Sequence, residues 1–225
     1  ASPFTLNHWR AMLSDPIFLV ALKNSLIIAS VTAVGGILLY SALAYLLVSR
    51  RTVTAPLLES LCWIPHVLPG ILLSLGVLWL VLATPLRFVL YGSVWGIAFA
   101  LILADSPVTT QAFKAGLLQL GGDLEEAARV SGASWGQTYR RVLLPLLAPI
   151  AAAVGLMNFG SALTSISTPV LLYSHQSRPL AILLLEYSFT GELERAAALG
   201  LLITLIVGAM MLIGRKLGLR LAGSE

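Results

Sequence analysis

Residues 24–49 read NSLIIASVTAVGGILLYSALAYLLVS, a run of 26 residues without a charged side chain between Lys23 and Arg50. An α-helix rises about 1.5 Å per residue and the hydrocarbon core of a bilayer is about 30 Å thick, so about 20 apolar residues are enough to cross it. We therefore predict a membrane-spanning helix over residues 24–48.

Four more uncharged runs follow, with lengths of 27, 17, 36 and 19 residues, at positions 60–86, 88–104, 142–177 and 196–214. Backbone polar groups in lipid need internal hydrogen bonds, so such runs predict helices. We expect further spans over residues 58–83, 90–113, 146–167 and 196–214. The predicted fold class is all-α, a polytopic membrane helical bundle of about five transmembrane helices.

Two of these spans contain residues that break helices. The second includes Pro65, Pro69 and Gly70, which must bend or interrupt it. The third includes Asp105 and Pro107. Between the last two spans, residues 180–185 are apolar, and we expect a short interfacial or re-entrant helix there.

The composition agrees with a membrane domain. Of 225 residues, 58% are hydrophobic and 11% are charged, whereas charged residues make up about 25% of an ordinary soluble domain. These values exclude a disordered tail and a standard cytosolic enzyme. The single cysteine, Cys62, excludes an internal disulfide framework. The sequence has no evident repeat or linker, so we assign residues 1–225 to one transmembrane domain.

The basic residues predict the orientation, because the cytoplasmic side of such proteins is richer in Lys and Arg. Nine of the 14 basic residues share one side of a five-span arrangement: Arg50, Arg51, Lys114, Arg129, Arg140, Arg141, Arg215, Lys216 and Arg220. We therefore expect the N-terminus outside and the C-terminus inside, in a bacterial cytoplasmic membrane. Residues 1–23 become an external arm with a short helix over residues 5–13. Since the chain begins with Ala1, we expect an earlier helix in a longer polypeptide. Tyr45 fits an interfacial aromatic belt.

The longest inner segment, residues 114–145, contains signals for two short helices. Asp123 is a suitable N-cap, and Glu126 stands three residues later, as in a capping box. Gly132 is placed to end this helix in the left-handed conformation. Ser134 can cap a second helix. We predict a compact helix on the cytoplasmic face, with small residues and carboxylates on its surface.

This segment resembles the EAA loop of binding-protein-dependent ABC importer permeases. Glu126-Ala127-Ala128 is followed after three residues by Gly132, and after nine more by Val142-Leu143-Leu144-Pro145. The family pattern has Ile where this chain has Val142. The resemblance extends over about residues 24–217. It implies the type I importer fold, with the EAA loop on the cytoplasmic side.

In that family the first helix of the loop is the coupling helix, which docks on a cytoplasmic ATP-binding subunit. The resemblance therefore implies that Glu126, Ala127, Ala128 and Gly132 form the docking element, and that Pro145 marks the junction between the loop and the next span. The chain has no Gly-x-x-x-x-Gly-Lys-Ser/Thr phosphate-binding loop. ATP hydrolysis is thus expected in a partner, and we do not expect this chain to be an enzyme.

The resemblance also implies partners and a solute. The partners are a dimer of ATP-binding subunits, a second permease half, an extracytoplasmic solute-binding protein and membrane lipid, without nucleic acid. Within the family the chain looks most like half of a ferric-iron-type permease, on the stretches Pro65–Gly70, Ser165–Thr168 and Glu192–Leu199. Permeases for thiamine, polyamines, phosphonates or sulfate share much of this pattern, so ferric iron is one expectation among these.

Polar residues within the spans are candidates for the translocation pathway: Asp105, Asn158, Ser161 and Thr164. An acidic group in hydrocarbon is costly, so Asp105 should face protein or water. It could instead cap the helix that follows at Pro107. The polar residues of the fourth span could equally support close helix packing.

An ion-driven secondary transporter or channel is the alternative function. It would need an ionisable relay within the spans, and only Asp105 qualifies. His8, His66 and His175 are widely separated and lack the spacing of metal ligands. We predict no metal site, no cofactor and no catalytic centre.

Overall fold

The computed structural model describes residues 12–49 and 55–216. Over these two ranges the chain is helical and has no β-strand. The predicted all-α class is therefore confirmed. The helix expected over residues 5–13 falls largely outside the described residues.

Two helices are long and apolar enough to cross a membrane without a break, namely α2 (Pro16–Ser49) and α13 (Leu193–Lys216). Three further apolar segments are pairs of helices with a sharp bend between them, so the number of spans reaches five if each pair counts as one. The prediction of about five apolar segments agrees with this arrangement, but three of the five are not single straight helices.

Helix α2 begins at Pro16 rather than at the predicted Asn24, inside the segment predicted to be an external arm. The Oδ1 atom of Asp15 accepts a hydrogen bond from the backbone N–H of Ile17 at 2.8 Å. Proline at the first helical position loses no hydrogen bond. These local signals start the helix before the charge at Lys23, on which the predicted boundary was based.

The second apolar segment is broken between α3 (Ala55–Val67) and α4 (Gly70–Ala83), which meet at 112°. This confirms the break predicted at the two prolines. Gly70 permits close contact with the segment after the fourth span, because a Cβ there would clash with Oγ of Ser167. One turn later, Ser74 Oγ donates a hydrogen bond to the carbonyl of Thr168 at 2.5 Å.

The third apolar segment bends by 56° between α6 (Val94–Ala104) and α7 (Ser106–Leu120). Helix α7 continues past Lys114, so the inner loop begins after Leu120 rather than at the predicted residue 114. The fourth bends by 75° before α11 (Ala148–Thr164). Single-turn helices α5 (Arg87–Leu90) and η2 (Pro169–Leu171) lie in the connections.

Helix α12 (Leu180–Phe189) confirms the short helix predicted over residues 180–185. It is fixed to the start of α2 by polar contacts. Asn24 Nδ2 donates to the carbonyl oxygens of Gln176 and Arg178 at 2.8 and 3.1 Å, and the backbone N–H of Leu180 donates to Ser25 Oγ at 2.7 Å.

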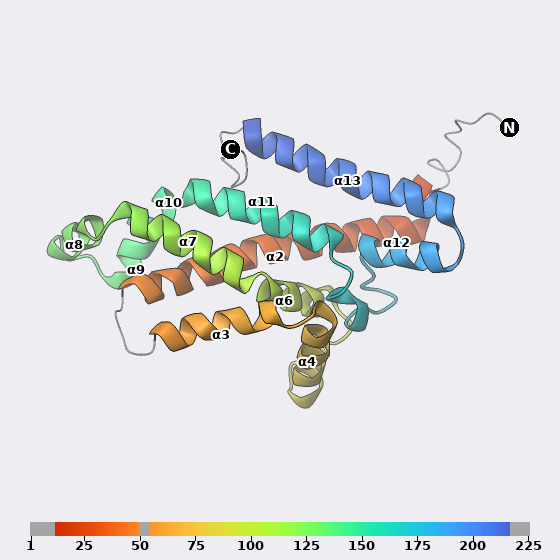
Figure 1. Cartoon of the computed structure of the whole chain (residues 1–225), viewed down its shortest axis with the longest axis horizontal. Helices are drawn as coiled ribbons and strands as arrows, with labels where there is room; N and C mark the ends of the chain where they lie inside the picture. The colour runs from red at the N-terminus through yellow and green to blue at the C-terminus, as the bar shows by residue number, and fades with distance from the viewer. Residues whose placement is uncertain (1–11, 50–54, 217–225) are drawn as a thin grey trace.

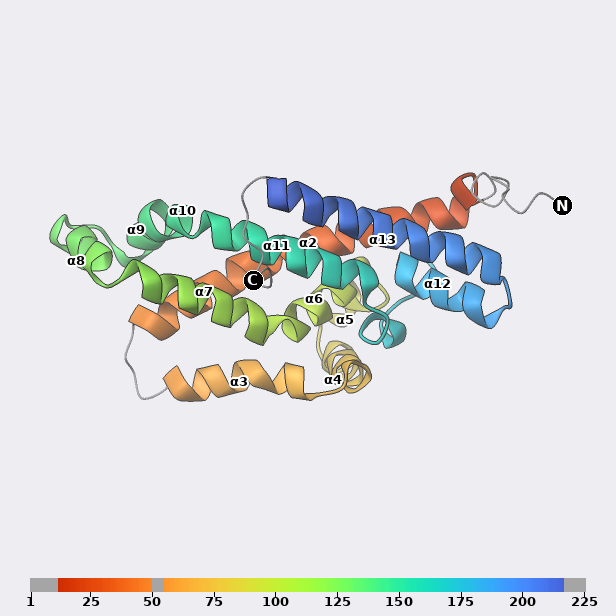
Figure 2. The same cartoon turned by 45° about the horizontal axis from the view of Figure 1, so that its top comes forward.

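Helix α2 is the centre of the bundle and packs against α7, α11 and α6 (Figure 1). Small residues allow this close approach: a Cβ at Gly36 would come within 2.9 Å of the Asn158 side chain. The loop that carries α8 (Asp123–Val130) lies at one end of the long axis, and α12 lies at the other end (Figure 2). The loop with α8 and helix α12 are therefore separated by the length of the bundle.

Candidate functional site

Helix α8 begins differently from the prediction. Gly122, not Asp123, is the N-cap, and no side chain caps this end, so the predicted Asp123–Glu126 capping box is wrong. Gly122 already has helical dihedral angles, and its carbonyl accepts the first hydrogen bond, from Glu126 N–H at 3.0 Å. Asp123 thus belongs to the first turn, with Glu125 and Glu126. Carboxylates there interact favourably with the positive end of the helix dipole.

The end of α8 matches the prediction. Gly132 has φ +79°, the left-handed conformation expected of it. Its N–H donates to the carbonyl of Arg129 at 2.9 Å, and Ala133 N–H donates to that of Ala128 at 3.0 Å. This pair of bonds is the Schellman motif, which satisfies the last carbonyls of a helix.

A second capped helix follows directly, as predicted for Ser134. Ser134 Oγ accepts from Gln137 N–H at 3.4 Å, and Ser134 N–H donates to Gln137 Oε1 at 2.8 Å. This capping box starts α9 (Trp135–Thr138), which continues into a π-helical turn over Tyr139–Leu143. The loop is therefore two short helices joined by a defined turn.

All eight residues of α8 remain at least partly exposed. Val130 is 90% exposed, and Leu124 and Ala127 are also on the surface. An ion pair between Glu125 and Arg129, at 2.7 Å, runs along the helix. The predicted docking residues Glu126, Ala127, Ala128 and Gly132 thus lie on one small, accessible element, with Ala128 the least exposed of them.

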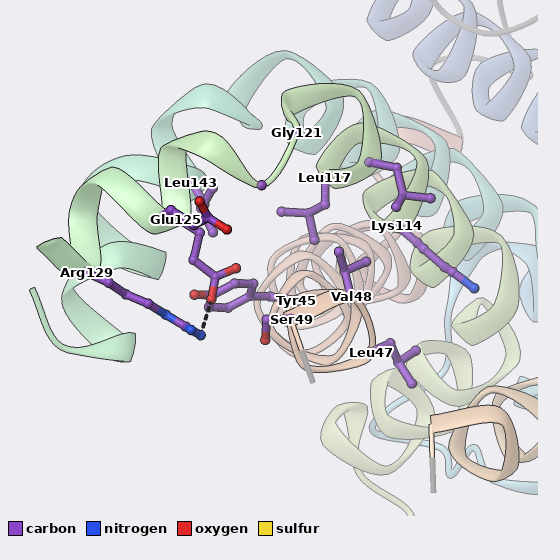
Figure 3. Close-up of a pocket in the computed structure, with 13 residues that line it drawn as sticks. Tyr45, Leu47, Val48, Ser49, Lys114, Leu117, Gly121, Glu125, Arg129 and Leu143 are labelled. Carbon is purple, nitrogen blue, oxygen red and sulfur yellow. Dashed lines mark hydrogen bonds and ion pairs between the residues drawn. The ribbon is translucent and has the colours of Figure 1, made fainter. Parts of the chain in front are cut away.

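A pocket of about 680 Å³ separates α8 from the ends of α2 and α7 (Figure 3). Lys114 and Leu117 line it from α7, and Glu125 and Arg129 line it from α8. Figure 3 shows the Tyr45 hydroxyl beside the Glu125 carboxylate. The loop that carries α8 is thus loosely packed against the bundle on this side.

We predicted that Tyr45 lies in an interfacial aromatic belt. Its side chain is instead buried inside the protein and only 1% exposed. Its ring stacks on Trp135 of α9 at 4.8 Å between centroids, and on Tyr139 at 5.7 Å. The spacing along α2 gave no sign of partners 90 or more residues away in sequence. Its burial against the Trp135 and Tyr139 rings explains the difference, because such aromatic pairs add about 0.5–1.5 kcal/mol beyond the area that they bury.

Pro145 lies in the one-turn helix α10 (Leu144–Leu146). The 75° bend follows at Leu147, and α11 begins at Ala148 with Pro149 in its first turn. The predicted junction residue is therefore next to the point where the loop turns into the fourth span.

Asp105 lies at the break between α6 and α7. It does not cap α7 through its side chain, which was the structural alternative. Its Oδ1 atom accepts a hydrogen bond from Ser161 Oγ at 3.3 Å, and Oδ2 is buried without a hydrogen-bond partner among the described residues. The structure thus brings Asp105 and Ser161 together.

Asn158 has different surroundings, although it stands one turn before Ser161. It is 5% exposed, and its amide exchanges hydrogen bonds with the Thr109 hydroxyl of α7 at 3.2 and 3.3 Å. Thr164 is exposed and donates to the carbonyl of Gly160 at 3.0 Å. Asn158 therefore takes part in helix packing, while Ser161 and Thr164 face outward.

One contact near the site was not predicted. Lys114 of α7 forms an ion pair with Glu59 of α3, with Nζ to Oε1 at 2.6 Å. Gln111 Nε2 donates to the same oxygen at 2.8 Å. Glu59 and Lys114 are far apart in the sequence, so no local pattern predicts that they pair. The one available hint was that both stand beside apolar runs.

Curated relatives agree with a permease. The chain is 28% identical over 224 residues to "Probable ABC transporter permease protein y4fN" of Sinorhizobium fredii, which covers 97% of this chain and 39% of that protein. It is 26% identical over 209 residues to the "Molybdate/tungstate transport system permease protein WtpB" of Thermococcus kodakarensis, covering 91% and 82%. It is 23% identical over 199 residues to the "Fe(3+)-transport system permease protein FbpB 2" of Haemophilus influenzae, covering 88% and 39%. The chain thus spans less than half the length of y4fN and of FbpB 2.

The fold is that of solved importers. A bacterial alginate ABC transporter, solved with an alginate-bound periplasmic protein, contains a chain that superposes with a TM-score of 0.77 at 16% identity, over 98% of this chain and 85% of that one. Residues 34–222 match the family model described as "Binding-protein-dependent transport system inner membrane component". Because this match covers most of the chain, the protein belongs to the family of inner membrane components of binding-protein-dependent transport systems.

Proposed function

We propose that the chain forms one half of the translocation pathway of an ATP-driven importer, and that α8 is the helix through which a separate ATP-binding subunit moves it. The length, exposure and position of α8 support this proposal. Eight residues make a helix too short to be stable alone in water, yet α8 has a defined end, is exposed throughout, and lies at the tip of the bundle. Such an element fits the surface of a partner.

The exposed residues indicate how α8 meets that partner. Leu124, Ala127 and Val130 follow each other at three-residue intervals and expose apolar surface, which favours burial against another protein. The small side chains of Ala127 and Ala128 permit close approach, and Glu126 offers a carboxylate for a polar contact. Gly132 holds the end of the helix, and Pro145 stands where its motion would pass into α11.

The complete transporter would contain two ATP-binding subunits, a second permease half and an extracytoplasmic solute-binding protein. ATP hydrolysis belongs to the ATP-binding subunits, and this chain has no enzymatic step. The end with α8 faces the cytoplasm, so the first described residues are outside and α13 ends inside. Arg129, Arg140 and Arg141, which belong to this loop, support that orientation.

The pathway runs along the face that carries Asp105, Ser161 and Thr164. A carboxylate with an unpartnered buried oxygen is costly in a membrane protein and points to a functional constraint. Asn158 belongs to packing rather than to the pathway, which is the alternative that the sequence left open.

Ferric iron is the solute that we propose. The likeness to FbpB 2 supports it, and so does the charge on the proposed pathway. A carboxylate attracts a cation and repels an oxyanion by Coulomb's law, so Asp105 suits an iron cation better than the molybdate or tungstate named for WtpB.

Two glycines of the loop provide the test. A Cβ at Gly132 or at Gly136 would meet nothing within 4 Å, but only Gly132 has positive φ. Gly132→Val therefore strains the backbone without a steric clash, by about 1–2 kcal/mol or more, whereas Gly136→Val does not. In the complete transporter we expect uptake of binding-protein-loaded ⁵⁵Fe(III) to fall about tenfold or more in Gly132→Val, with the permease still inserted, and to persist in Gly136→Val. Normal uptake and normal ATPase stimulation in Gly132→Val would refute the docking role.

A further inference from the structure

The coupling loop is joined to the first span by three aromatic rings, which we call the ring cluster: Tyr45, Trp135 and Tyr139. The planes of the three rings lie within 16° of parallel, and Trp135 and Tyr139 are 6.0 Å apart. We propose that Tyr45 is the positioning residue through which a displacement of α8 reaches α2. This inference rests on the proposed docking of α8.

The connection from α8 to the ring cluster is short and fixed. The Schellman motif at Gly132 ends α8, and the capping box at Ser134 starts α9 two residues later. Trp135 is the first residue of α9. Every residue between the two helices thus takes part in, or stands next to, a backbone hydrogen bond. A push on α8 therefore moves the Trp135 ring instead of being absorbed by a loose linker.

The connection from the ring cluster to α2 is equally firm. Tyr45 is buried, and it packs with Phe113, Leu117 and Leu143 in one apolar cluster. One turn before it on α2, Ser41 Oγ lies 2.6 Å from the Tyr139 hydroxyl. Two successive turns of α2 are thus held by α9 and the π-helical turn. Pulling these rings apart would expose aromatic surface to water, which opposes their separation.

Beside the ring cluster, where Tyr45 itself lines a pocket, the packing of α8 is open. The 680 Å³ pocket lies between Glu125 and Arg129 of α8 and the ends of α2 and α7 (Figure 3). This space leaves room for α8 to shift relative to α2, with the Glu125 carboxylate beside the Tyr45 hydroxyl as one contact across it. The ring cluster is therefore the packed contact that transmits the motion of α8 to α2, and the pocket provides the space for that motion.

The test measures two distances in the complete transporter in lipid nanodiscs, in a Cys62→Ser background. Spin labels at Ser131→Cys, next to α8, and at Leu212→Cys on α13 report movement of the loop. Labels at Leu38→Cys on α2 and at Leu212→Cys report movement of the span; Leu38 and Leu212 are 57% and 63% exposed. The probe is a non-hydrolysable ATP analogue. We expect it to shift both distances in the otherwise unaltered protein.

Tyr45→Leu should keep the shift of the loop and lose most of the shift of α2, whereas Tyr45→Phe, which retains the ring, should keep both. Tyr40→Leu is the matched control, since Tyr40 is also buried on α2 but donates to the carbonyl of Ile102; it should keep both shifts. If Tyr45→Leu keeps both shifts, the inference is wrong while the docking of α8 stands. If the analogue moves neither label pair in the unaltered protein, the docking proposal fails, and the inference fails with it.

Trp135→Leu covers the case in which Tyr45→Leu does not assemble. Trp135 is 38% exposed, so its replacement disturbs the core less. It should again separate the two shifts, and retention of both in Trp135→Leu would overturn the inference. As a second readout, ATP hydrolysis per solute transported should rise in any variant that separates them, which a loss of stability alone would not produce.

Discussion

At the scale of single residues, α11 shows how one helical turn separates two roles. Asn158 points into the contact with α7 and α2, and it is satisfied there by Thr109. Ser161, one turn later, is exposed and reaches only the Asp105 carboxylate. At 3.6 residues per turn, positions three apart are offset by about 60° around the helix, so one can lie in the packed contact while the other lies at its edge. Their shared polarity therefore does not imply a shared function.

Asn158→Ala should destabilise the protein by about 1 kcal/mol, because it leaves the buried Thr109 hydroxyl unpaired; hydrogen bonds between membrane helices contribute about this much or less. Ser161→Ala should destabilise it less, because the hydrogen bond to Asp105 that it removes is exposed and long. Thermal unfolding of the purified protein in detergent measures both. Equal losses for the two variants would mean that Ser161 also belongs to the packing.

Asp105→Asn should retain the stability of the protein and reduce its uptake activity. The amide removes a charge whose Oδ2 atom has no hydrogen-bond partner among the described residues, so stability should stay equal or rise. Uptake of binding-protein-loaded ⁵⁵Fe(III) should fall about tenfold, the factor that corresponds to about 1.4 kcal/mol of lost stabilisation. Uptake that is unaffected, together with lower stability, would assign Asp105 to structure instead.

At the scale of helices, the sequence predicts what depends on local signals. The apolar runs predict the spans, Pro65–Gly70 predicts a break, and Gly132 predicts the end of α8. The start of α8 was predicted wrongly because Asp123 and Gly122 are both acceptable N-caps. The pairing of Tyr45 with Trp135 depends on how α2 packs on the loop, and no local pattern records it.

The ion pair between Glu59 and Lys114 is a contact of this long-range kind, and it fixes α3 on α7. Its side chains are 30% and 26% exposed, so its contribution is that of a partly screened pair, about 0.5–1 kcal/mol. A double-mutant cycle with Glu59→Gln and Lys114→Gln, followed by thermal unfolding, should give a coupling energy of this size. The more exposed pair of Arg195 with Glu192, three residues apart within the last helix region, should give less. A larger coupling energy for Arg195 and Glu192 would contradict the expectation that the less exposed pair contributes more.

At the scale of the whole molecule, the bundle keeps its two candidate contact regions at opposite ends of one long axis (Figures 1 and 2). The loop that carries α8 is at one end, and α12, with the preceding carbonyls that Asn24 binds, is at the other. A bilayer across the middle of this axis puts the two ends in different compartments. An ATP-binding subunit and a solute-binding protein could then act on the same chain from opposite sides.

Membrane orientation can be measured at these two ends with single cysteines in a Cys62→Ser background. Phe189 ends α12 and is 81% exposed, and Ser131 follows α8 and is exposed as well. A membrane-impermeant maleimide applied to spheroplasts should label Phe189→Cys at once, and should label Ser131→Cys only after the membrane is opened. The reason is the basic character of the loop at Arg129, Arg140 and Arg141, which retains it in the cytoplasm. Labelling of Ser131→Cys from outside would remove α8 from the reach of any cytoplasmic ATP-binding subunit.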